Sequence, residues 1–385
     1  MKENLRNCDK PLLVMTIIFS ILGLLMVFSA SSIISSFSVK TSPYHYFVRQ
    51  LIFISLCYGA FFIFILHFPI AKYKNLTIIY GLVMLASLIL LFPFGVRIYG
   101  AKSWFNMWNL FHYQPSEFTK IFIILYLAFF FERYQKIKNI KKSFYYPLII
   151  IMFILFLILR QPDLGTAVLI SILTFGIYFF IPLNKKNKKN LYFMITLLVI
   201  LGGLSFLVFK NDFLKGFQKE RFNYKQPCLR YVERSGYQLC NSFIAINNGG
   251  LFGSGLGNST QKYLYLPAGH TDFIFAIILE ELGSIVGVLI IIAYIYMLYR
   301  IVKIAKSTSN LRNSIIAFGT FIIISVHILI NLAGILGLIP LTGVPLPFLS
   351  YGGSFTIVTY MLIFLVQRVA VENNQSKLAK ELKRL

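Results

Sequence analysis

Ten long apolar runs constrain the fold of this chain more than any other feature of its sequence. They cover residues 12–34, 47–67, 76–94, 116–132, 144–159, 164–182, 191–209, 271–299, 313–336 and 348–367. Most of them reach the roughly 20 residues that a helix needs to cross a lipid bilayer, and the run at 144–159 is the short one. The sequence therefore predicts an all-α polytopic membrane protein with about ten transmembrane helices.

The composition points to the same class of protein. Hydrophobic residues make up 57% of the 385 residues, phenylalanine alone occurs 39 times, and only 13% of the residues are charged. This balance is typical of membrane proteins and not of soluble ones. Residues 1–385 are expected to form a single membrane domain, with a large extracellular loop at 210–269 and a cytoplasmic tail at 368–385.

Positive charges in the short connections predict the orientation of the chain. Lys and Arg gather at 133–142, 185–189 and 300–312, whereas the connection at 35–46 carries a single lysine and that at 337–347 carries no charge. Cytoplasmic loops of membrane proteins carry an excess of Lys and Arg. Both termini are therefore expected in the cytoplasm and the long loop outside.

Most of the net charge of +24 follows from this orientation and does not indicate nucleic acid binding. The long outer loop is the exception, because its eight cations face only three acids. The excess suggests an anionic partner at the outer membrane surface, and a merely solvated loop is the alternative. The cations are Lys210, Lys215, Lys219, Arg221, Lys225, Arg230, Arg234 and Lys262.

The cysteines, and the absence of metal-binding and phosphate-binding motifs, say little about function. Cys228 and Cys240 share the long outer loop and could form a disulfide, although two free thiols are the expectation. The sequence contains no metal-ligand spacing and no Walker-type loop, which disfavours ATP-driven chemistry.

The stretch Gly249–Gly283 contains the strongest signal for function. Five glycines between residues 249 and 257 predict an ordered re-entrant segment whose backbone can approach a ligand closely. Asp272 then begins a long apolar helix at the membrane boundary, where a carboxylate is costly, so it is the best catalytic candidate. His270 beside it could orient a group or relay a proton, or simply act as a cap.

Two more acids follow within that predicted helix. Glu280 lies eight residues beyond Asp272, about 12 Å deeper at the rise of a helix. Glu280 and Glu281 are expected to pair with groups on neighbouring helices, with Lys120 among the candidates. Such a depth disfavours a direct role in a reaction outside the membrane.

Two further clusters precede this stretch. Glu117 and Lys120 are three residues apart at a helix start and can form a structural ion pair. Asp163 follows a tight turn and is expected to cap the next helix. Trp104, beside Lys102, is either an interfacial aromatic or the floor of a surface that binds lipid or sugar.

Several motifs, taken in order, resemble the SEDS family (shape, elongation, division and sporulation) over essentially the whole chain. They are residues 26–31, Trp104, 114–120, 161–166, 249–283 and 345–353. The resemblance implies a peptidoglycan glycosyltransferase that polymerises lipid II at the outer face of the bacterial plasma membrane. Residues 255–259 and 265–267 look more like the division branch of the family than its elongation branch. Ala268 departs from the family pattern, which usually has an acid there.

The resemblance also implies roles for individual residues. Asp272 would be the general base that accepts the proton of the attacking hydroxyl. Lys262, Arg221 and Lys102 would stabilise the departing diphosphate. The remaining residues expected to bind substrate are Trp104, His270, Ser259 and Gly257. No cofactor is implied with certainty, and a divalent cation at the diphosphate is left open.

The implied partners are lipid II, the nascent glycan strand, a class B penicillin-binding transpeptidase and other membrane proteins of cell division. Two other classes of function remain open at this point. A lipid II flippase or transporter would use the buried acids and Lys120 as a translocation path. A non-catalytic scaffold of the division machinery would need only the helical surfaces and the tails.

Overall fold

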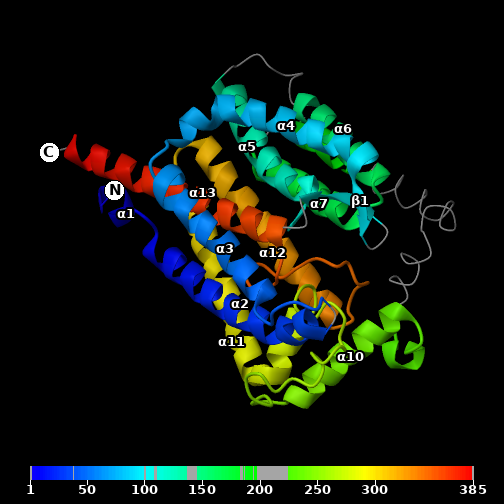
Figure 1. Ribbon diagram of the computed structural model, residues 1–385. Helices are drawn as coiled ribbons and strands as arrows, with labels where there is room; N and C mark the ends of the chain where they lie inside the picture. The colour runs from blue at the N-terminus through cyan, green and yellow to red at the C-terminus, as the bar shows by residue number, and fades with distance from the viewer. Residues whose placement is uncertain are drawn as a thin grey trace.

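The structure is a computed structural model that describes residues 2–37, 39–98, 101–107, 111–136, 145–182, 185, 187–193, 195–196 and 224–383. These residues are mostly helical, and the long helices run side by side as a bundle (Figure 1). The helices are α1 (Lys2–Arg6), α2 (Lys10–Phe37), α3 (His45–Ala60), α4 (Tyr73–Phe94), α5 (Pro115–Lys136), α6 (Tyr146–Arg160), α7 (Leu164–Phe180), α10 (Arg234–Gly249), α11 (Ile274–Ser307), α12 (Leu311–Ile335) and α13 (Gly353–Leu382). A π-helical turn, Phe61–Ile65, continues α3, and a short 3-10 turn, Ile70–Lys72, precedes α4.

The predicted apolar runs are mostly helical where the structure describes them, which confirms the predicted fold class, although residues 271–273 and 348–352 precede α11 and α13. Among the described residues, six helices are long and apolar enough to cross a membrane: α2, α3 with its π-helical turn, α4 with its 3-10 turn, α11, α12 and α13. The run at 144–159 is indeed short, as α6. Most of the run at 191–209 lies outside the described residues. The number of spans and their orientation therefore remain predictions.

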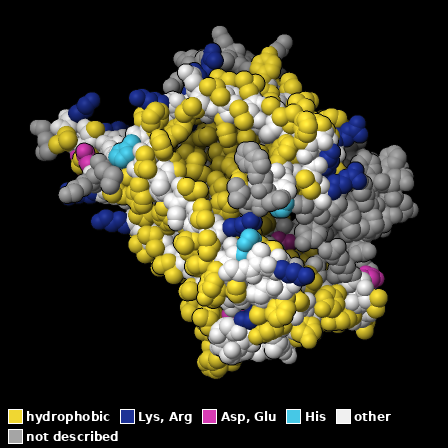
Figure 2. All heavy atoms as spheres, viewed as in Figure 1, with side chains coloured by type: hydrophobic (Ala, Val, Ile, Leu, Met, Phe, Trp, Pro, Cys, Tyr) yellow, Lys and Arg dark blue, Asp and Glu magenta, His cyan; other side chains and the backbone are white. Residues whose placement is uncertain are grey.

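The bundle has a buried centre and an apolar exterior. In the span of α13, 89% of the residues are buried, and Figure 1 shows this helix between α3 and α12. The corresponding share is only 44% in α2 and 28% in α4. Figure 2 shows apolar side chains over the flank that α2 and α3 form, Ile21 among the exposed residues. Apolar residues on both the inner and the outer faces of helices are what a lipid environment requires.

A small sheet between α4 and α5 was not predicted from the sequence. Its three antiparallel strands are β1 (Val96–Ile98), β2 (Ala101–Met107) and β3 (Phe111–Tyr113), in that order. Trp104 pairs with Val96, and Asn106 pairs with His112 across the second ladder. The strands are too short to form an alternating pattern that could be recognised among the apolar runs.

Helix α11 is broken, which corrects the expectation of one continuous helix after Asp272. Gly283 has φ 81° and ψ 168°, so residues 274–282 form a separate half-helix. A Cβ at Gly283 would lie 2.4 Å from the carbonyl oxygen of Leu251. The glycine-rich segment therefore packs its backbone directly against the break. The break follows Glu280 in the chain, so the expected depth of about 12 Å for this acid stays a prediction.

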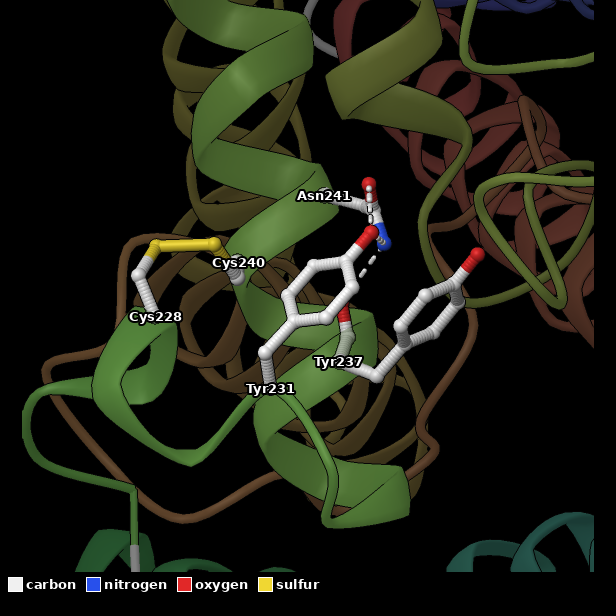
Figure 3. Close-up of a disulfide and its surroundings, with 5 residues drawn as sticks. All are labelled: Cys228, Tyr231, Tyr237, Cys240 and Asn241. Carbon is white, nitrogen blue, oxygen red and sulfur yellow. Dashed lines mark hydrogen bonds between the residues drawn. A yellow bond between two sulfur atoms is a disulfide. The ribbon is translucent and has the colours of Figure 1, made fainter.

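The predicted long loop at 210–269 contains the helix α10, so it is less irregular than expected. Cys228 and Cys240 form a disulfide, and the expectation of two free thiols is wrong (Figure 3). The turn Pro227–Arg230 folds back on α10 and brings the two Cα atoms to 4.9 Å. Such tertiary proximity cannot be read from spacing alone. Beside the bridge, the Tyr231 ring packs against Tyr237 with a centroid distance of 4.7 Å.

Candidate functional site

Asp272 lines a pocket between α10, the turn before α11, the end of α12 and the segment 341–344. The pocket encloses about 370 Å³, which includes space open to solvent. Its polar lining residues are Gln238, Asp272, Asn331 and Thr342, and Asp272 is the acid among the described residues that line it. We refer to it as the Asp272 pocket. A general base needs such a position beside a cavity, and the role of Asp272 stays a prediction.

Hydrogen bonds fix the backbone around Asp272. Asn331 Nδ2 donates to the carbonyl oxygens of Asp272 (2.7 Å) and Val344 (2.8 Å). Ser350 Oγ donates to the Thr271 carbonyl at 2.7 Å, and the Tyr351 amide donates to the His270 carbonyl at 3.0 Å. Residues 270–272 are thereby attached to α12 and to the segment before α13. The predicted cluster at 345–354 thus holds the site, in addition to packing helices.

His270 is enclosed by aromatic rings. The ring centroids of Tyr46 and Tyr351 lie 4.8 Å and 5.9 Å from that of His270. Burial lowers the pKa of His270 from its usual 6.5 to about 4. The imidazole is therefore neutral at physiological pH and cannot supply positive charge to a diphosphate. Its Nδ1 has no hydrogen-bond partner among the described residues.

Lys262 does not line the Asp272 pocket, and its expected role at a diphosphate stays a prediction. Its ammonium is buried, lies 3.1 Å from Glu281 Oε1 and donates to Ser29 Oγ at 3.3 Å. It also donates to the carbonyl of Gly257. A cation that is already paired and buried in this way is part of the scaffold.

The carboxylate of Glu280 accepts hydrogen bonds from consecutive residues of the re-entrant segment. Its carboxylate accepts from Thr260 Oγ1 at 2.8 Å, from the amides of Thr260 and Gln261, and from Asn248 Nδ2 at 3.1 Å. Ser259 Oγ donates to the second carboxylate oxygen. Ser259, like Gly257, therefore belongs to the scaffold and not to the pocket. We call Glu280, Glu281, Lys262, Ser259 and Ser29 the Glu280 anchor.

The predicted pair of Glu117 and Lys120 is present inside the bundle, with a 2.6 Å contact. His327 of α12 joins it, because its Nε2 lies 3.1 Å from the Lys120 ammonium. Its Nδ1 lies 2.6 Å from the Ile323 carbonyl and must donate to it, so Nε2 is the acceptor. These three residues, here the Glu117 cluster, border a second, small cavity of about the size of one water molecule. Among the described residues, Lys120 contacts Glu117 and His327 and neither Glu280 nor Glu281, so this candidate partner of the two acids is ruled out.

The other predicted site residues that the structure describes make contacts within the protein framework. Asp163 caps α7 by accepting from the amide (3.1 Å) and hydroxyl (2.9 Å) of Thr166, which confirms its predicted role. The Lys102 ammonium donates to the carbonyls of Phe92 and Pro93 at the end of α4. Trp104 is partly buried in β2, edge-on to His112.

Arg221 lies outside the described residues. In the part of the chain that the structure describes, no three His, Cys, Asp or Glu side chains come together as metal ligands would. The cation at the diphosphate therefore remains an expectation.

Asn331, Gln238, Thr342 and His327 were not identified from the sequence as site residues. Asn331 and His327 did leave a signal, because they are polar residues four apart within the apolar run at 313–336. Four residues is one helical turn, so both belong to the same face of α12. Polar side chains aligned inside a span indicate a shared buried environment.

Comparisons with known proteins agree with the geometry. The sequence model of a family of cell cycle proteins, named for FtsW, RodA and SpoVE, matches residues 10–375. A probable peptidoglycan glycosyltransferase FtsW of Bacillus subtilis is 34% identical over 99% of this chain and 95% of its own length. Stage V sporulation protein E of the same organism is 33% identical over 94% of this chain and 96% of its own.

Solved structures share the fold. The rod shape determining protein RodA of Thermus thermophilus matches with a TM-score of 0.64 at 24% identity, over 94% of this chain and 96% of its own. A chain from a peptidoglycan synthase complex that coordinates polymerization and crosslinking matches with a TM-score of 0.69, also at 24% identity, over 94% and 97%. At this identity the likeness concerns the fold.

Proposed function

This chain belongs to the FtsW, RodA and SpoVE family of cell cycle proteins, and on that premise we propose that it polymerises lipid II into glycan strands with Asp272 as the general base. It is a multi-pass protein of the plasma membrane and a glycosyltransferase of peptidoglycan synthesis. The observation that carries the proposal is that Asp272 lines a pocket. Its backbone carbonyl accepts a hydrogen bond from Asn331, which lines the same pocket from α12.

The proposed reaction needs one base and a stabilised leaving group. A sugar hydroxyl of the acceptor attacks the anomeric carbon at the reducing end of the growing chain. A new glycosidic C–O bond forms as the bond between that carbon and the diphosphate oxygen breaks, with inversion. Asp272 accepts the hydroxyl proton, and the lipid diphosphate departs with the bonding electron pair. Because Lys262 is already paired, Arg221 is the remaining first choice to stabilise the leaving group.

Substitution of the base tests the proposal. Asp272→Asn keeps the size of the side chain and removes its basicity, so polymerisation should fall by roughly 10²–10⁴-fold. The assay uses purified full-length protein with its class B penicillin-binding partner, labelled lipid II and gel analysis of the glycan strands. Asp163→Asn is the matched control, because asparagine caps a helix as aspartate does. Near wild-type polymerisation by folded Asp272→Asn would refute the proposal and direct attention to Glu117.

We also propose that the pocket faces the outside of the cell. The disulfide Cys228–Cys240 supports this orientation, because disulfides persist in oxidising compartments. In a variant in which Cys8 and Cys57 are serine, a cysteine at the exposed Val232 should react with an impermeant maleimide in intact cells. One at the exposed Lys380 of α13 should react only after lysis. The opposite pattern would invert the topology.

A role in septal wall synthesis is the proposed cellular function. The relatives named FtsW, together with the division-type motif at 255–259, support it. A solved relative that coordinates polymerization and crosslinking supports a transpeptidase as the partner. Expression of the chain should restore septation in cells depleted of their own division polymerase. Rescue of elongation-polymerase depletion alone would assign it to the other branch.

A further inference from the structure

The side chain of Asn331 has an unusual position for an amide. It lies in the last two turns of α12, it is only 4% exposed, and it lines the Asp272 pocket. Burying an amide is costly unless its polar atoms find partners. Its Nδ2 group uses both donors on two carbonyls that belong to different walls of the pocket, those of Asp272 and Val344.

These two hydrogen bonds also determine which end of the amide is oxygen. If the side chain were turned over, its oxygen would face two carbonyl oxygens at hydrogen-bonding distance, and neither can donate. The orientation with nitrogen toward Asp272 and Val344 is therefore the consistent one. Oδ1 must point elsewhere.

In that orientation Oδ1 of Asn331 is an acceptor without a donor. It is buried, and it has no hydrogen-bond partner among the described residues. Buried side-chain acceptors in proteins are nearly always satisfied. Since Asn331 lines a pocket, a ligand that enters the pocket can supply the missing donor.

The chemistry of the two polar groups restricts that ligand. The carboxylate of Asp272 and Oδ1 of Asn331 are both acceptors, and the two residues line one pocket. A diphosphate ester offers acceptors only and carries negative charge, so it is a poor match for such a site. A sugar with neighbouring hydroxyl or acetamido N–H groups offers several donors.

We propose that the Asp272 pocket is the subsite for the attacking acceptor sugar, with Asn331 as a residue that both binds this sugar through Oδ1 and positions Asp272 through Nδ2. The inference rests on the proposed function and specifies which part of the reaction the pocket serves. In this arrangement the hydroxyl that attacks donates to Asp272 and a neighbouring donor of the same sugar occupies Oδ1. The diphosphate of the donor chain then lies outside the pocket.

Asn331→Ala removes the acceptor and both donors. Loss of one neutral hydrogen bond to the sugar should raise the KM for the acceptor several-fold, up to roughly 10-fold. Release of the Asp272 backbone should lower kcat by about 10-fold or more, because small displacements of a base are costly. Steady-state rates with labelled lipid II, at varied acceptor concentration and corrected for the folded fraction, give both quantities.

Asn331→Asp provides a readout that a purely structural residue would not change. A second carboxylate in the same pocket disfavours the charged form of Asp272 and raises its pKa. The acidic limb of the pH–rate profile should therefore move to higher pH. Asn373→Ala is the control, because Asn373 is 5% exposed and its Nδ2 donates to the Ile304 carbonyl and to Ser307 Oγ, away from the pocket.

The outcomes separate this inference from the proposed function. A raised KM and lowered kcat in Asn331→Ala, a shifted pH profile in Asn331→Asp and neither change in Asn373→Ala support it. An unchanged acceptor KM in folded Asn331→Ala would overturn the contact with the sugar. An unshifted profile in Asn331→Asp would overturn the placement of this side chain beside the Asp272 carboxylate. If Asp272→Asn is inactive while Asn331→Ala behaves like wild type, the proposed function stands and this inference fails.

Discussion

The Glu280 anchor and the Glu117 cluster bury acids in the same bundle by different means. Each carboxylate oxygen of Glu280 and Glu281 accepts at least one hydrogen bond. Glu117 uses only Oε1, and its Oε2 has no partner among the described residues. The first group is saturated and closely enclosed, whereas the second keeps one carboxylate oxygen without a partner among the described residues, beside a small cavity.

The difference indicates what each group does in the fold. The partners of Glu280 are mostly neutral donors from consecutive residues, so the acid determines the shape of one segment and the entrance to α11. The Glu117 cluster connects α5 with α12 through Lys120 and His327, so it determines the distance between two helices. A saturated site tolerates little change, while a site with spare space can rearrange.

Glu280→Ala should have the largest effect. It removes the acceptor of five donors, and two of these, Ser259 Oγ and the Gln261 amide, are buried and cost about 1–3 kcal/mol each when unsatisfied. We expect little folded protein, measured as the monodisperse fraction in detergent. Glu280→Gln keeps an acceptor oxygen and should recover part of the yield. Normal yield in the alanine variant would show that the anchor is dispensable.

Glu117→Ala should also destabilise the protein strongly, but less than Glu280→Ala. It leaves the Lys120 ammonium buried without its carboxylate, a defect of about 3–5 kcal/mol. His327 and the cavity offer partial compensation, which the anchor lacks. Thermal unfolding of detergent-solubilised protein should show the loss, and Glu117→Ala with Lys120→Met should recover part of it. If the double variant is no better than the single one, the pair does not act as a unit.

Loss of the disulfide should cost less than either acid. Cys228 and Cys240 are 12 residues apart, and closing a loop of that size contributes up to about 3 kcal/mol. The effect is local to α10, which also carries Gln238 of the Asp272 pocket. Replacing both cysteines by serine should lower the unfolding midpoint by the same amount as adding reductant to the wild type. A midpoint insensitive to reductant would mean that the bridge does not support α10.

Acid should produce a gradual effect, through His270. Burial between Tyr46 and Tyr351 lowers its pKa to about 4 from 6.5. Between these pH values the unfolded chain binds the additional proton. The stabilising contribution is therefore complete above pH 6.5 and lost as the pH falls toward 4. In His270→Gln, the midpoint of thermal unfolding should depend less on pH between 4 and 6.5 than in the wild type. An unchanged pH dependence would contradict the assignment.

The sequence predicted what depends on local spacing. The apolar runs became helices because length and hydropathy are properties of each segment. Asp163 as a cap and Glu117 with Lys120 as a pair were found because their partners are three residues away. Asp272 stood out because an acid at the end of an apolar helix is rare.

What the sequence did not reveal depends on contacts between distant segments. Lys262 meets Ser29 across 233 residues, and Asn331 meets Asp272 across 59, so neither role has a local pattern. The break in α11 was missed because the glycine at 283 follows an apolar stretch that reads as a continuous helix. Only the packing of Leu251 and Gly253 against it makes the break necessary.

The break at Gly283 also has a genetic consequence. A Cβ there would lie 2.4 Å from the oxygen of Leu251 and 2.5 Å from the nitrogen of Gly253, and backbone atoms cannot rotate away as a side chain can. The positive φ adds a second obstacle for any other residue. Every missense change of this codon meets both obstacles at once. In a library of variants selected for function, codon 283 should accumulate synonymous substitutions alone, while codons for the exposed residues of α11, such as Val288, drift among apolar amino acids.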